Sequence, residues 1–190
     1  MGELRMIRLA FILGAALLMA VIIHIATIFA IPYNSQNDVW HRMLSLGPLH
    51  RIHTVSDPKE AIALSQDLDP AFAYGICRVD LTDAPILLKG NLTGDFWSLN
   101  YLDRQGRSQF SVTNQISGPV INVVLATRGQ QRLLSERPDL IEDTTIIISA
   151  TENQGLLLLR AFVASERNRS ATADAISALS CGPLWRQDTL

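Results

Sequence analysis

Residues 94–106, GDFWSLNYLDRQG, contain the pattern that decides the fold. Trp97, Leu99 and Tyr101 alternate with polar residues, so in an extended strand they lie on one face, as in a half-buried β-strand. Phe110 in the following segment can face them across a hairpin. We expect these side chains to form a core face. A ligand-binding platform is the alternative, but alternation explains the aromatic residues without a ligand.

Turn sequences follow this strand and recur later in the chain. Asp103-Arg104-Gln105-Gly106 fits a type I turn followed by a glycine in the left-handed region. Glu152-Asn153-Gln154-Gly155 repeats the pattern between the last two expected strands. Both stretches therefore predict hairpin loops.

From residue 70 onward, short runs rich in β-branched and aromatic residues alternate with turn clusters. Seven strands are expected, at residues 73–81, 85–92, 95–103, 108–115, 120–128, 144–152 and 155–165. Their regular spacing predicts a mainly β, antiparallel sandwich or barrel. Residues 129–143 interrupt the series as a short helix or loop that Pro138 prevents from continuing. Residues 172–182 predict a final helix that covers an open end or edge of the sheets.

The amino-terminal part has a different composition. Residues 9–31 are 23 positions without a formally charged side chain, enough to cross a hydrocarbon core of about 30 Å as a helix. A cleaved signal sequence is the alternative. Its apolar region would be shorter, and cleavage after Ala26 or Ala30 would need a small residue where His24 or Ile28 stands. The sequence therefore favours a retained anchor.

Charge around this segment predicts its orientation. Arg5 and Arg8 precede it, and Arg42 is the first basic residue beyond it, which places the amino terminus in the cytoplasm. Short helices are expected at residues 35–47 and 56–70, the second with Pro58 in its first turn. The expected organisation is a cytoplasmic end, a transmembrane helix, a helical connector and an extracytoplasmic β-sandwich domain, at residues 1–8, 9–31, 32–69 and 70–190.

The charge pattern and the motifs exclude several functions. The net charge is −2 with acids and bases interspersed, so a nucleic-acid partner is not expected. We find no nucleophile elbow, HExxH motif, glycine-rich phosphate loop or EF-hand loop. A non-enzyme without a cofactor is favoured, although a β-sandwich can assemble a site from scattered loops.

A few charged side chains remain as candidates for binding. Arg78 and Asp80 alternate with apolar neighbours and are expected to be an exposed pair. Arg160 interrupts the most apolar strand, so it needs a carboxylate, a carbonyl or water as a partner. Together with Asp103, these are the residues from which a pocket could be built. Structural salt bridges are the favoured interpretation, and a pocket is the alternative.

Histidine and cysteine leave two further questions open. His50 and His53 are three positions apart, which on a helix would put two metal-binding imidazoles on one face. Exposed connector histidines are the alternative, and no metal is expected. Cys77 and Cys181 can form a disulfide or remain separate. The chain has no CxxC motif, so nothing supports a thiol oxidoreductase.

Two strand motifs carry a family resemblance. They are RxDLxxxPxxL and, further on, two aromatic residues followed by Ser-Leu-x-x-x-Asp. The residues concerned are Arg78, Asp80, Leu81, Pro85 and Leu88, then Phe96, Trp97, Ser98, Leu99 and Asp103. The chain resembles, most closely over residues 69–128, a bacterial domain family of unknown function numbered twelve fifty-four.

This resemblance implies a jelly-roll-like β-sandwich. Because the family is bacterial, the anchor predicted from the apolar segment is expected in the inner membrane, with the domain in the periplasm. Longer family members join this domain to a second β-rich domain, so a separately encoded partner carrying that domain is expected here. Two functions follow as hypotheses. The favoured one is a binding or accessory component of an envelope assembly. The alternative is an envelope-acting enzyme or small-ligand binder with a pocket at one end of the sandwich.

Overall fold

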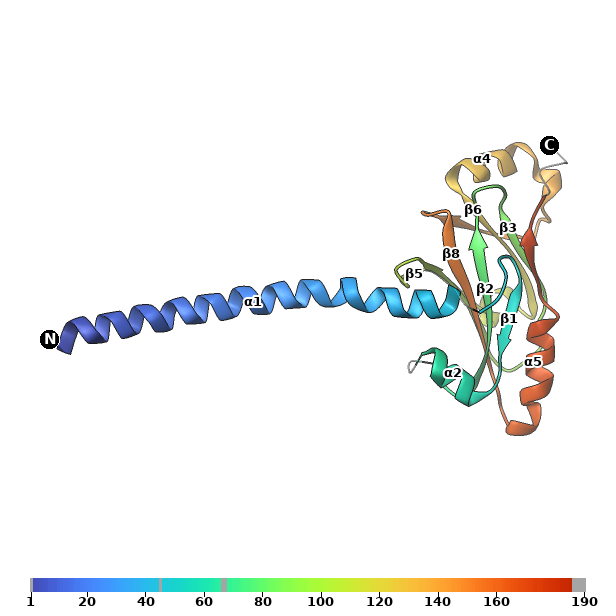
Figure 1. The fold of residues 1–190 in the computed structure, drawn as a ribbon. Coiled ribbons are helices and arrows are strands. Elements are labelled where there is room, and N and C mark those ends of the chain that lie inside the picture. Colours follow the sequence, from blue (N-terminus) through green and yellow to red (C-terminus); the bar gives the residue numbers. More distant parts are fainter. Residues whose placement is uncertain (1, 45, 66–67, 186–190) are drawn as a thin grey trace. The chain divides into compact units, whose positions relative to one another are not determined.

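The structure is a computed structural model that describes residues 2–44, 46–65 and 68–185, with the backbone alone for residues 32–42 and 44 (Figure 1). The chain divides into two compact units, residues 1–38 and 39–190.

A single long helix, α1 (Gly2–Leu44), accounts for the first unit and enters the second. The most apolar window of 18 residues in its stretch Gly2–Ile31 has a mean hydropathy of 2.6, and none of the side chains in that window is buried. By length and composition this stretch can cross a membrane, a property that it shares with signal sequences. The separate helix expected at residues 35–47 is not a distinct element, because α1 continues to Leu44.

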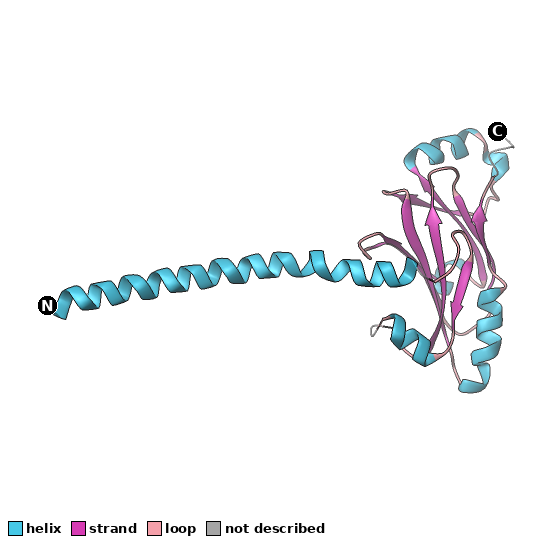
Figure 2. Cartoon of the chain, in the orientation of Figure 1, coloured by secondary structure: helices cyan, strands magenta, loops and turns pink. Residues whose placement is uncertain are grey.

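The described residues form nine strands in two sheets (Figure 2). The five-stranded sheet has the order β1-β2-β8-β4-β5 and the four-stranded sheet the order β7-β6-β3-β9. The bounds are β1 Ile52–Val55, β2 Phe72–Asp80, β3 Ile86–Asn91, β4 Trp97–Asp103, β5 Ser108–Thr113, β6 Val120–Thr127, β7 Ile146–Ala150, β8 Gln154–Phe162 and β9 Ser180–Pro183. All seven expected strands are present, within two residues at most ends.

The main core lies between the two sheets. Trp97, Leu99 and Tyr101 are buried on the inner face of β4, as the alternation predicts. They belong to the same apolar cluster as Ile121 and Leu125 of the four-stranded sheet. The domain is therefore a mainly β structure of two open sheets with helices around them, and its described strands do not close into a barrel.

Two strands and one pairing differ from the expectation. β1 lies inside the expected helical connector and pairs with β2, and β9 lies at the end of the expected final helix and pairs with β3. β6 and β7 pair in parallel, so the prediction of a wholly antiparallel fold is wrong. The reason is the connection between them. Parallel neighbours need a long connection that returns the chain to the end of the sheet where the first strand began. Helix α4 (Arg128–Glu136) and the short 3₁₀ helix η1 (Pro138–Leu140) provide this length between β6 and β7.

The shorter helices cover the sheets. α2 (Pro58–Leu64) starts as expected, with the Asp57 carboxylate accepting a hydrogen bond from the Lys59 backbone at 2.8 Å. α5 (Arg169–Ser177) follows η2 (Glu166–Asn168) and packs against β1 and β2, with Ile176 fully buried in the core. It covers one side of the two-sheet core, the role expected of the final helix. α3 (Asn114–Ser117) connects β5 to β6.

A second apolar cluster extends the domain toward the amino terminus. Met43, Val55, Ala61 and Leu64 are buried against Tyr74 on the outer face of the five-stranded sheet. Met43, Val55, Ala61 and Leu64 lie in residues 32–69, which the sequence predicts as a helical connector outside the sandwich. The connector instead supplies both an edge strand and the covering layer of this sheet.

A disulfide joins the two sheets. Cys77 in β2 is bonded to Cys181 in β9, across 104 residues of sequence. The sequence alone left open whether these two cysteines are bonded, and the structure shows that they are. It connects the five-stranded sheet to the strand that completes the edge of the four-stranded sheet.

The two expected hairpin loops have different backbones. Gly106 has φ 75° and its N–H donates to the Asp103 carbonyl at 2.9 Å, which confirms the predicted turn. The second stretch is not a hairpin loop, so that prediction is wrong: it connects β7 of the four-stranded sheet to β8 of the five-stranded sheet, and Gly155 lies inside β8 without a positive φ. A Cβ at position 155 would overlap the ring of Tyr101. Close packing, rather than a turn, requires this glycine.

Candidate functional site

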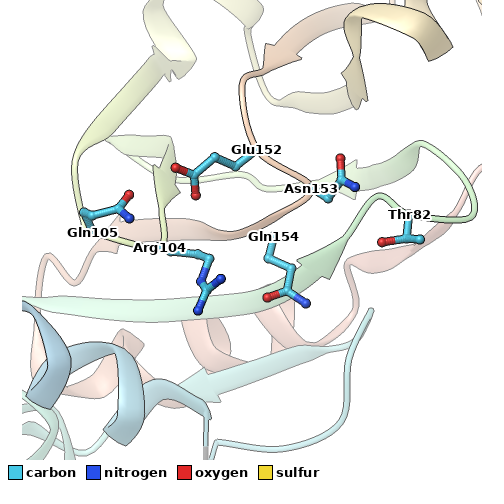
Figure 3. A pocket seen from close by; sticks show the side chains of 6 residues that line it. All are labelled: Thr82, Arg104, Gln105, Glu152, Asn153 and Gln154. Atoms are coloured by element: carbon cyan, nitrogen blue, oxygen red, sulfur yellow. The ribbon is translucent and has the colours of Figure 1, made fainter.

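A polar pocket lies at the end of the sandwich where three connections meet: β2 to β3, β4 to β5 and β7 to β8 (Figure 3). Its volume is about 510 Å³. The residues that line it are Thr82, Arg104, Gln105, Glu152, Asn153 and Gln154. The two turns come together because β4 pairs with β8, with Asp103 opposite Gly155.

The Asp80 carboxylate supports one wall of this pocket. It accepts hydrogen bonds from the backbone and hydroxyl of Thr82, at 2.9 and 2.5 Å, and from the Gln154 amide at 2.9 Å. The hydrogen bond from the Thr82 hydroxyl, then that from Gln154, holds the pKa of Asp80 below its usual range. An ionised Asp80 thus ties together two lining residues that are far apart in the sequence.

The Asp103 carboxylate supports the opposite wall. Its side chain is 1% exposed and accepts hydrogen bonds from the backbone of Gln105 and Arg107, from Arg107 Nε and from Gln109 Nε2, all within 3.0 Å. Burial opposes ionisation, but the hydrogen bonds from Arg107 and Gln109 outweigh it and lower the pKa of Asp103. The β4–β5 loop is therefore organised around a buried negative charge.

Two opposite charges remain available in the pocket. Arg104 extends from the β4–β5 loop and Glu152 from the β7–β8 turn (Figure 3). The side chains of Arg104 and Glu152 form no hydrogen bond or ion pair with each other or with any other described residue. A free guanidinium and a free carboxylate in one pocket can each bind a ligand group of the opposite charge.

The four predicted binding residues do not converge. Asp80 and Asp103 lie behind the pocket walls, whereas Arg78 Nη1 donates to the Gly47 carbonyl at 2.9 Å. Arg160 is six residues along β8 from Gln154: its Nε donates to Ser98 Oγ at 2.7 Å and its guanidinium lies 5.5 Å from the ring centre of Phe72. Direct ligand binding by these four residues stays a prediction.

The two histidines that the sequence offers as weak metal ligands lie in different backbone elements. His50 lies in a turn with φ 60°, and His53 lies in β1, so they do not share a helical face. His50 Nε2 is 3.1 Å from both the backbone nitrogen and the carbonyl oxygen of Asp80, and His53 Nε2 is 3.7 Å from Glu60. Within the described residues, no group of three or more potential ligand side chains is arranged to hold a metal.

Sequence reasoning identified the turns of this pocket but not the pocket. The sequence predicts Arg104, Gln105 and Glu152 as loop residues of two separate hairpins, whereas in the structure Glu152 lies in a connection between the two sheets. The missing information was that β4 and β8, which are far apart in sequence, are neighbours. The matching polar composition of the two turns was the available signal.

Comparisons with known proteins give a fold but no function. No family model matches the chain, and no curated protein matches it. The VPA0106 protein of Vibrio parahaemolyticus is similar in structure, with a TM-score of 0.54 and 10% identity over 72% of this chain and 31% of that one. A putative uncharacterized protein from Burkholderia cenocepacia has a TM-score of 0.43 and 16% identity over 62% and 32% of the two chains. This chain thus spans about a third of the length of both structures, and it shares the fold of the Vibrio protein.

Proposed function

We propose that this chain is an anchored binding protein of the bacterial envelope. In this proposal residues 9–31 cross the inner membrane, the amino terminus is cytoplasmic and the β domain lies in the periplasm. The disulfide between Cys77 and Cys181 is the observation that carries the proposal, because disulfides persist in oxidising compartments and are rare in the cytosol. Arg5 and Arg8 before the apolar helix support the orientation.

Alkaline phosphatase fused after Leu190 tests this placement, because the enzyme is active only outside the cytoplasm. We expect activity in the membrane fraction, and loss of activity when residues 9–31 are deleted. An inactive fusion expressed at a normal level would contradict the proposal. The mass of the full-length protein then separates a retained anchor from cleavage after Ala26 or Ala30.

We also propose that the sandwich is of the jelly-roll-like type and belongs to the domain family numbered twelve fifty-four. The motif residues that suggested this family hold the fold together. Leu81, Leu88 and Leu99 are buried, and Asp80 and Asp103 organise the loops at one end. These roles explain why such residues would recur in a family even without catalytic chemistry.

The binding function that we favour is association with another envelope protein. Exposed apolar side chains on the four-stranded side support it: Ile147 on the edge strand β7 is 41% exposed and Leu133 on α4 is 49% exposed. An edge strand with such residues is a suitable site for adding a partner's strand. The partner that we propose is a separate chain with the second β-rich domain of longer family members.

A photo-crosslinking amino acid at position 147 tests this association in cells. We expect it to capture one envelope protein in stoichiometric amount, and the same amino acid at position 59, on the exposed face of α2, to capture none. Equal capture from both positions, or capture from neither, would contradict the proposed interface.

The polar pocket favours a second candidate function, the binding of a small ligand. Its volume of about 510 Å³ is within the range of ligand sites, roughly 300–1,000 Å³. Complementation of a gene deletion separates the two functions. If the function is association with a partner protein, a gene that encodes Ile147→Lys should fail to restore the wild-type phenotype. If the function is ligand binding, the double variant Arg104→Gln with Glu152→Gln should fail to restore it.

A further inference from the structure

We propose that the polar pocket binds a small zwitterion, a molecule with a carboxylate and an ammonium group such as a short unblocked peptide. The proposal rests on the small-ligand function and specifies its ligand class. The recognising groups are Arg104 for the carboxylate and Glu152 for the ammonium.

The charges in the pocket select this class. Arg104 and Glu152 make no hydrogen bond or ion pair with other described residues, so both are available to a ligand. A guanidinium can hold a carboxylate through two parallel hydrogen bonds, and a carboxylate accepts from an ammonium. A ligand with only negative charge would be repelled by Glu152, and one with only positive charge by Arg104.

The remaining lining residues favour a peptide over an apolar molecule. They are a hydroxyl and three amides, from Thr82, Gln105, Asn153 and Gln154, and they offer both donors and acceptors. Such side chains can pair with the N–H and C=O of a peptide bond lying between the two charged ends. None of the described lining residues is apolar, so hydrophobic burial contributes little to binding.

The pocket is preorganised, because hydrogen bonds hold its lining loops in place without a ligand. The buried Asp103 fixes the loop that carries Arg104, while Asp80 ties Thr82 to Gln154. The Leu81 backbone N–H also donates to the Asn153 carbonyl at 2.7 Å, which joins two of the three connections directly. Fewer backbone rearrangements are then needed on binding, which lowers its entropic cost.

Calorimetry on the full-length protein in detergent tests the proposal, with alanyl-alanine, its N-acetyl derivative and its C-terminal amide as probes. We expect the unblocked dipeptide to bind most tightly, and each blocked form to bind about tenfold more weakly or worse, because each loses one charge-assisted contact. Arg104→Gln should remove the difference between the dipeptide and its amide. Glu152→Gln should remove the difference between the dipeptide and its acetylated form.

Lys59→Gln is the matched control, since it also removes an exposed charge but lies on α2 outside the pocket lining. It should leave all three affinities unchanged. Equal affinity for the three probes, or affinities that neither pocket variant changes, would overturn the zwitterion proposal. If a neutral disaccharide binds instead and Gln154→Ala abolishes that binding, the zwitterion is wrong while the small-ligand function stands. Pocket variants that fully complement the gene deletion would remove the small-ligand function itself.

Discussion

At the scale of single residues, the pocket end of the sandwich depends on the contact between Gly155 and Tyr101. The tyrosine is fully buried and its hydroxyl donates to the Glu152 carbonyl at 3.5 Å. Its ring occupies the space where any other residue at position 155 would place a Cβ. One glycine thus permits a large aromatic core residue to lie directly beneath a pocket-lining turn.

Gly155→Ala should destabilise the fold by about 1–3 kcal/mol, because the added methyl overpacks a fully buried site. Guanidinium denaturation of the detergent-solubilised protein, followed by tryptophan fluorescence, measures the change. Gly94→Ala is the control, since a Cβ at Gly94 meets no atom within 4 Å. Similar denaturation midpoints for the two variants would show that the ring yields to the methyl.

Tyr101 should also make stability depend on alkaline pH. Burial, followed by the charges of Glu152 and Asp103, raises its pKa to about 12 from an ordinary value of 10.0. Because the folded-state pKa is the higher one, this contribution is complete below pH 10 and is lost as the pH rises toward 12. Tyr101→Phe should flatten this loss and remove a tyrosinate step near pH 12 from absorbance at 295 nm. An unchanged titration would refute the assignment.

At the scale of elements, sequence pattern predicted the strands that have a pattern of their own. Strands such as 95–103 alternate over enough residues to be recognised alone. β1 has four residues, and β9 contains Gly182 and Pro183; both are strands because β2 and β3 offer edges to pair with. The parallel pairing of β6 with β7 and the adjacency of β4 and β8 likewise depend on distant partners. The pocket could not be predicted from the sequence, because it forms only where β4 and β8 lie side by side.

The packing of α5 on β2 gives an element-scale prediction. A Cβ at Gly75 would lie 2.7 Å from Ile176 Cγ2, so Gly75→Ala should push the helix away. Ile176→Ala should itself cost about 2–5 kcal/mol by leaving a cavity. In the double variant the new methyl enters that cavity, so the loss of unfolding free energy should be smaller than the sum of the two single losses. Additive losses would contradict this contact.

The disulfide gives a second element-scale prediction. Replacing Cys77 and Cys181 together by alanine should lower the free energy of unfolding by about 4 kcal/mol, because the bridge closes a loop of roughly 100 residues in the unfolded chain. The wild-type denaturation midpoint should fall on adding dithiothreitol, while that of the double variant should not change. A wild-type midpoint insensitive to complete reduction would count against a stabilising bridge.

At the scale of the whole molecule, the folded unit starts well before residue 70. Residues 39–190 form one compact unit, and Met43, Val55 and Ala61 cover the outer face of the five-stranded sheet. The boundary that composition suggests is misplaced because a covering layer of short helices has no strand pattern. Apolar side chains such as Ile76 need this layer to be shielded from water.

Truncation should locate this boundary. A chain that begins at Val39 should be monomeric and unfold cooperatively, whereas one that begins at Pro70 should aggregate, since it lacks β1 and the outer cluster. A chain that begins at Pro48 loses Met43 alone from the buried members of that cluster and should be intermediate in thermal stability. Size-exclusion chromatography and circular dichroism measure both properties. Equal stability of all three chains would show that the outer cluster is dispensable.

The late position of β9 has a consequence for the newly made chain. Cys77 leaves the ribosome 104 residues before the cysteine that it is bonded to in the finished protein, and the strand that carries that partner forms the edge of the four-stranded sheet. Neither this edge of the four-stranded sheet nor the bridge can form until residues 180–183 have been made. During that interval the Cys77 thiol is open to other oxidants and thiols, so a premature stop codon shortly before residue 181 would release a chain that has most of its strands but lacks the covalent link between the two sheets.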